Sequence, residues 1–101
     1  MKILISYILA WILFTQVFNS NADFVPQNVE ILSIWFDDGV VTINLSEDVM
    51  NYGGTYFEYN FVNILLNNAA ALPYPNYLTV LVEGRVRHLP EGVEIFRTPL
   101  R

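Results

Sequence analysis

The stretch EILSIWF (residues 30–36), Asp37-Asp38-Gly39 and VVTINL (residues 40–45) decides how this chain folds. Both apolar runs are rich in β-branched and aromatic residues, which favour strands. Asp38-Gly39 is typical of a two-residue type I′ turn, in which both residues take positive φ. The pattern therefore predicts a β-hairpin with strands over 30–36 and 40–45.

The position of the turn also predicts which side chains share a face, because side chains alternate along a strand. The expected apolar pairs are Phe36–Val41, Ile34–Ile43 and Leu32–Leu45, and the expected pairs on the other face are Trp35–Thr42, Ser33–Asn44 and Ile31–Ser46. The hairpin would then have one core face and one more polar face.

A helix is expected after the polar stretch that ends at Gly53-Gly54. Thr55 and Glu58 have the spacing of a capping box, in which each side chain accepts a hydrogen bond from the other residue's backbone N–H. Apolar residues then recur at helical spacing: Phe61, Val62, Leu65, Leu66, Ala69 and Leu72. Pro73 and Pro75 end the predicted helix over 56–71.

A third strand is predicted over 77–83, with Leu78, Val80 and Val82 facing inward. Gly84 marks a turn, and residues 85–89 could form a short fourth strand. The third strand should pair beside the hairpin through a crossover. We therefore expect an α+β fold: a small sheet of β-β-α-β-(β) order with one helix packed on one face, preceded by a hydrophobic N-terminal export helix.

The N-terminal segment has the pattern of a secretory signal peptide over residues 1–22. Lys2 supplies the positive start, residues 3–14 the apolar run, and Ser20-Asn21-Ala22 a cleavage site after Ala22. The alternative is an uncleaved anchor, although the run is shorter than the roughly 20 apolar residues that span a bilayer. A buried core helix is less favoured, because residues 8–14 have no polar face.

Residues 23–29 are predicted to be a linker, because Pro26 argues against regular structure, and residues 30–101 form the domain. The apolar run is not followed by a cysteine, so the sequence predicts no lipid anchor. The chain would be extracytoplasmic, either secreted or membrane-anchored and facing outward, and would touch a membrane only through its N-terminal segment.

Composition excludes several functional classes. The chain has ten acidic residues and five basic ones, a net charge of −5, and every basic residue after Lys2 follows Gly84. Nucleic-acid binding needs a basic patch, so we expect none. Cysteine is absent, which excludes disulfides and zinc–thiolate sites. We expect no cofactor and no metal.

Few residues suggest catalysis. His88 is the sole histidine and is interpreted as a surface residue. The pairs Asp37-Asp38 and Glu47-Asp48 could do acid–base work or bind calcium. The turn already explains the first pair, and solvated loop charges explain the second.

Gly53-Gly54 before a helix could hold an anion, but it lacks the lysine of a phosphate-binding loop. Trp35, Tyr77 and Leu81 are predicted to form an apolar patch on the sheet face away from the helix. This patch either packs in the core or binds a partner.

The chain resembles the GerM domain (sporulation and spore germination), in its C-terminal part. The resemblance rests on VTINLS (41–46), Gly53-Gly54-Thr55 with Glu58, LTVLVEG (78–84) and TPLR (98–101), with Leu72-Pro73 at the position of the family's Phe-Pro. Asn44, Ile64 and Asn68 depart from the family pattern. The family's first strand and helix have no counterpart, which would leave a sheet edge and part of the core open.

The resemblance implies a non-enzymatic protein of the bacterial cell envelope, with a link to sporulation or germination. We therefore expect an interaction or assembly module whose partner is itself or an envelope protein. A small secreted hydrolase, a hydrolase inhibitor and a truncated fragment without function are the alternatives, and a hydrolase would need a convergent polar cluster.

Overall fold

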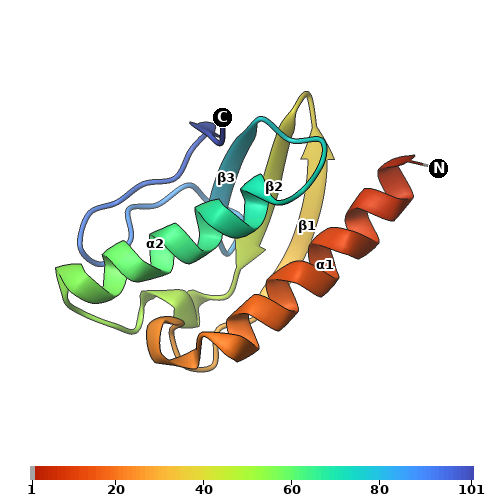
Figure 1. Ribbon diagram of the computed structural model, residues 1–101. Helices are drawn as coiled ribbons and strands as arrows, with labels where there is room; N and C mark the ends of the chain where they lie inside the picture. The colour runs from red at the N-terminus through yellow and green to blue at the C-terminus, as the bar shows by residue number, and fades with distance from the viewer. Residues whose placement is uncertain (1) are drawn as a thin grey trace.

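The computed structural model describes residues 2–101, and in the first helix it describes the side chains from residue 8 onward. The elements are α1 (Lys2–Ser20), η1 (Ala22–Phe24), β1 (Ile31–Asp37), β2 (Val40–Leu45), η2 (Glu47–Met50), α2 (Thr55–Ala70), β3 (Tyr77–Val82) and β4 (Thr98–Pro99). The sheet order is β1-β2-β3-β4, and both helices lie on one face of the sheet (Figure 1). The predicted α+β class with a leading helix is confirmed.

The hairpin forms around the predicted turn. Asp38 and Gly39 have φ of 50° and 77°, as a type I′ turn requires. The pairs Phe36–Val41, Ile34–Ile43, Trp35–Thr42 and Ser33–Asn44 are confirmed. The predicted register near the turn and the limits of the second strand are therefore correct, whereas the first strand begins and ends one residue later than predicted, at Ile31 and Asp37.

At the far end of the hairpin the predicted register is wrong. A bulge between Ile31 and Ser33 places Ile31, not Leu32, opposite Leu45, and Leu32 is 42% exposed. Ser46 explains the shift, since its N–H donates to Glu30 O at 2.9 Å and its Oγ accepts from Glu30 N–H at 2.8 Å. The extra residue of a bulge reverses the faces of the residues beyond it.

β3 pairs in parallel with β2 over its whole length, and its inward residues Leu78, Val80 and Val82 are buried as predicted. The predicted fourth strand over 85–89 is wrong, since only a single bridge joins Val82 to Arg85. Glu83 and Gly84, with φ of 51° and 80°, form a tight turn, and no strand follows it beside β3. The short β4 instead pairs antiparallel with the start of β3.

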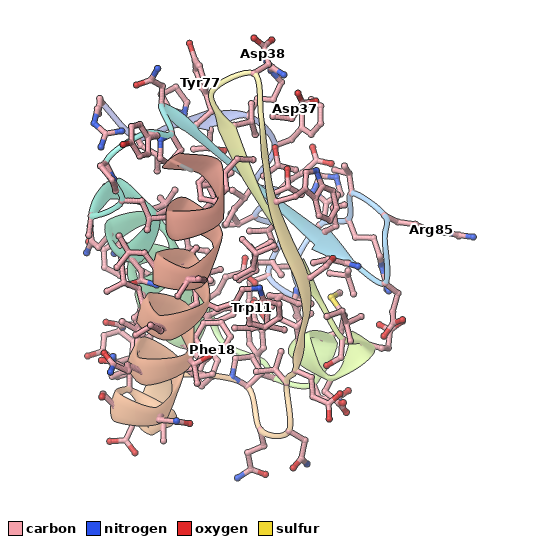
Figure 2. The ribbon with its side chains drawn as sticks, turned by 90° about the vertical axis from the view of Figure 1, so that its right-hand side faces the viewer. Trp11, Phe18, Asp37, Asp38, Tyr77 and Arg85 are labelled. Carbon is pink, nitrogen blue, oxygen red and sulfur yellow. The ribbon has the colours of Figure 1, made fainter. Side chains whose placement is uncertain are left out.

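One hydrophobic core lies between the sheet and the helices. α2 contributes Phe61, Leu65 and Ala69, while α1 contributes Ala10, Phe14 and Phe18 at four-residue spacing. The sequence disfavours a buried core helix over residues 8–14, and this prediction is wrong because Ala10 and Phe14 are buried in the core. A helix that is apolar on every side can bury one stripe and expose another. Figure 2 shows Trp11 between α1 and β1.

The predicted signal segment is thus a packed helix here, although Met1 and the side chains of residues 2–7, Lys2 included, lie outside the described part. In the described part of the chain, no helix has both the length and the apolar character needed to cross a bilayer. The predicted linker also packs: Val25 is buried, and the Phe24 ring lies 5.6 Å from that of Tyr56.

Candidate functional site

The most buried acidic side chain, Glu58, holds the start of α2 to the C-terminal segment. Its carboxylate is 1% exposed and accepts three hydrogen bonds, from Tyr52 Oη at 2.7 Å, Glu91 N–H at 2.8 Å and Val93 N–H at 2.9 Å. The predicted capping box is therefore wrong. The N-cap residue is Gly54, with no side-chain cap bond, and the Glu58 carboxylate accepts from Tyr52, Glu91 and Val93 instead.

The loop before α2 binds a carboxylate of its own chain. Gly54, with φ of 101°, donates its N–H to Glu91 Oε2 at 3.0 Å. The Glu91 carboxylate therefore lies at the N-terminus of α2, where an external anion would otherwise bind. Together, Glu58 and Glu91 fasten residues 91–93 to the N-terminus of α2.

Tyr52 belongs to the same cluster. Burial raises the pKa of Tyr52, and the hydrogen bond to Glu58 and the negative charges of Glu58 and Glu91 raise it further. Its ring stacks against Phe57 with centroids 4.6 Å apart. A protonated tyrosine and a carboxylate with three donors hold these segments together.

The other polar candidates lie apart. His88 is exposed, which confirms the prediction of a surface residue, and its Nδ1 lies 3.1 Å from Gly92 O. Asp37 and Asp38 lie exposed at the hairpin tip (Figure 2). Glu47 pairs with Arg87 at 2.8 Å on the surface. Within residues 2–101, no cluster of three His, Cys, Asp or Glu side chains could hold a metal ion.

A recess of about 450 Å³ lies between residues 22–28 and the start of α2. It is lined by Ala22, Asp23, Val25, Pro26, Gln27, Asn28, Asn51, Tyr52 and Phe57. Asp23 is the only carboxylate among these residues, and Tyr52 is the other titratable side chain in the lining. The Tyr52 hydroxyl is already bonded to Glu58.

Trp35, Tyr77 and Leu81 lie on one face of the sheet, as predicted, and are named here the open-face patch. Trp35 stands opposite Thr42, which stands opposite Thr79, and Tyr77 and Leu81 flank Thr79 at two-residue spacing. No helix covers this face (Figure 2). Tyr77 is 37% exposed, with the Arg97 guanidinium 5.8 Å from its ring centroid, while Trp35 and Leu81 are half-buried.

Sequence reasoning missed three contacts across the fold. Asn44, which departs from the GerM pattern, accepts the Gly84 N–H at 2.8 Å. Arg101 donates to the carbonyls of Ala70, Leu72 and Pro75 at the end of α2. Glu91 is the third. A cation is favoured at a helix C-terminus, but no local motif pairs residues 30 positions apart.

Comparison with known proteins gives one structural neighbour. No family model matches the chain, and no curated protein matches it. A crystal structure of a protein described as a candidate lipoprotein from Clostridium perfringens superposes with a TM-score of 0.75 at 18% identity. The match covers 83% of this chain and 60% of that one, so this chain spans less than two thirds of its neighbour's length. At this identity the match shows a shared fold.

Proposed function

We propose that this chain is a non-catalytic, GerM-like module of the bacterial cell envelope, exported through its N-terminal segment, that assembles through its sheet with a second copy of itself. Three observations support the proposal: an N-terminal segment without charge from Ile3 to Ala22, the lipoprotein description of a protein with the same fold, and apolar side chains on the sheet face that the helices do not cover. A role in sporulation or germination rests on the GerM resemblance and belongs to the same proposal.

The open-face patch is the observation that carries the proposal. Trp35 lies on β1, which forms one edge of the described sheet, so its half-buried side chain lies beside a strand edge and on the face opposite to the helices. Exposed strand edges are ready sites for pairing with another chain. Aromatic residues are also enriched at protein interfaces.

The polar cluster at α2 supports the non-catalytic part. The Glu58 carboxylate is buried and already accepts three hydrogen bonds, and Glu91 is bound to Gly54 N–H. A general acid or base must reach a substrate proton. Neither carboxylate combines that access with a second catalytic group.

Analytical ultracentrifugation of the full chain and of Trp35→Ser tests the assembly. We expect the wild-type chain to dimerise, and the dimer dissociation constant of the variant to be at least tenfold higher. Tyr56→Ser is the matched control, because Tyr56 is an equally aromatic but 72% exposed residue on α2. A monomeric wild-type chain, or equal weakening by both variants, would refute the role of the patch.

A further inference from the structure

The inner face of α1 is held by the core. Ala10, Phe14 and Phe18 are buried, and the Phe18 ring lies 6.2 Å from that of Phe61 on α2. α1 packs against α2 on one side and against β1 on the other, and the space that it fills between them is called here the groove. The three side chains repeat every four residues, so a single stripe of the helix makes the contact.

The outer face of α1 is also apolar at two of its described positions. Ile8 and Ile12 are 53% and 48% exposed, and no charged residue occurs from Ile3 to Ala22. Single exposed apolar side chains are common on soluble proteins, but a surface helix normally carries charged residues on its outer face. An exposed surface of α1 that carries Ile8 and Ile12 and no charge is suited to contact with lipid.

The seam between α1 and α2 contains an unpaired donor. Asn68 Nδ2 is buried without a hydrogen-bond partner among the described residues. Asn68 lines a recess of about 320 Å³ together with Val17 and Asn21 of α1 and with Ile64, Asn67 and Ala71 of α2. A buried unpaired donor costs free energy that hydration would recover. Withdrawal of α1 would let water reach Asn68, which lowers the cost of opening the groove.

We propose that α1 is a reversible membrane-binding helix, which fills the groove between α2 and β1 in water and leaves it to lie on a neutral lipid bilayer. The inference rests on the proposed envelope location of the chain. The exposed Thr15, Gln16 and Asn19 of α1 suit the polar edge of a bilayer. Trp11 is of the residue type that favours the bilayer–water interface.

Charge selects the kind of lipid surface. Residues 23–101 carry ten acidic residues and four arginines, a net charge of −6. Anionic lipids attract basic segments and would repel this body. Binding should therefore be stronger to phosphatidylcholine vesicles than to vesicles containing phosphatidylserine, and the difference should shrink as salt is added.

Cosedimentation of the full chain with phosphatidylcholine vesicles tests the binding. We expect vesicle-bound protein whose tryptophan emission is quenched by brominated phosphatidylcholine, and loss of that quenching in Trp11→Phe. Ile8→Asn/Ile12→Asn changes only exposed positions, so the fold should persist by circular dichroism while vesicle affinity falls at least tenfold. No wild-type binding, or unchanged binding of this folded variant, would overturn the proposal.

A reversible lock tests the departure of α1 from the groove. Because the chain has no cysteine, Val17→Cys/Asn68→Cys is designed to form a unique disulfide across the recess that both residues line, and Val17→Cys/Ile64→Cys is the alternative pair. We expect the reduced protein to bind vesicles and the oxidised protein to bind at least tenfold more weakly. Equal binding of both forms would show that α1 binds lipid without leaving, contrary to the proposal. Dimer formation through Trp35 is measured separately, so either proposal can fail alone.

Discussion

The Tyr52 hydroxyl donates a hydrogen bond of 2.7 Å to the buried carboxylate of Glu58. The same carboxylate accepts hydrogen bonds from the backbone N–H groups of Glu91 and Val93. One side chain thereby joins the loop before α2, the helix itself and the segment that follows β3. Segments far apart in sequence depend on this single acceptor.

Replacement of the acceptor should be costly. Glu58→Ala leaves the Tyr52 hydroxyl and two backbone N–H groups without their partner, and we expect the free energy of unfolding to fall by roughly 3 kcal/mol. Urea denaturation followed by circular dichroism measures the loss. Glu94→Ala, at an exposed glutamate in the same segment, is the control and should change stability by less than about 0.5 kcal/mol.

Alkaline pH should destabilise the fold through Tyr52. The unfolded state releases the tyrosine proton near its ordinary pKa of about 10, whereas the folded state keeps it because the pKa of Tyr52 is raised. Stability is therefore fully present below about pH 10 and falls as the pH rises further. Tyr52→Phe should flatten this dependence in urea titrations between pH 8 and pH 11, and an unchanged slope would contradict the assignment.

The bulge in β1 predicts unequal costs at two apolar positions. Ile43→Ala creates a cavity in the core and should cost about 3 kcal/mol. Leu32→Ala removes a side chain that is 42% exposed and should cost less than about 1 kcal/mol. Similar losses for the two variants in urea denaturation would favour the uninterrupted hairpin register.

Burial of α1 can be tested in the same way. Phe14→Ala should lower the free energy of unfolding of the full chain by about 3–4 kcal/mol, because the ring is fully buried. Ile12→Ala, two positions earlier on the outer face, should cost less than about 1 kcal/mol. An equally small effect of both changes would mean that α1 does not pack in the groove.

Removal of the unpaired donor at the α1–α2 seam should stabilise the chain. Asn68→Leu replaces the amide with an apolar group of similar size, and we expect a gain of about 1 kcal/mol in the free energy of unfolding. The same variant should bind phosphatidylcholine vesicles more weakly, because α1 is held more firmly. A loss of stability would indicate that the Asn68 amide has a partner in solution.

Local sequence patterns predicted the elements that depend on local physics. Asp38-Gly39 determines the hairpin because positive φ at both positions is a property of those two residues. The spacing of Phe61, Leu65 and Ala69 likewise predicts α2 and its buried side. The open-face patch follows from alternation along the strands, and its partner role stays a prediction.

The errors have a common cause, which is competition from distant residues. Ser46 pairs with Glu30 and shifts the register, and the backbone of residues 91–93 draws Glu58 away from its capping position. For α1 the sequence could not predict the buried side, because residues 8–14 are apolar throughout and show no helical alternation of apolar and polar residues. Burial of Phe14 therefore depends on a groove that only the folded chain provides.

Because α1 precedes α2 in the chain, α1 is synthesised before the segment that it packs against. The helix leaves the ribosome before α2 has been made, so the groove that buries Phe14 and Phe18 does not yet exist. During that interval the apolar stripe is open to capture by a targeting factor or a translocation channel. Under the proposed export, translation speed as well as affinity would decide between export and docking, and slower elongation should favour export.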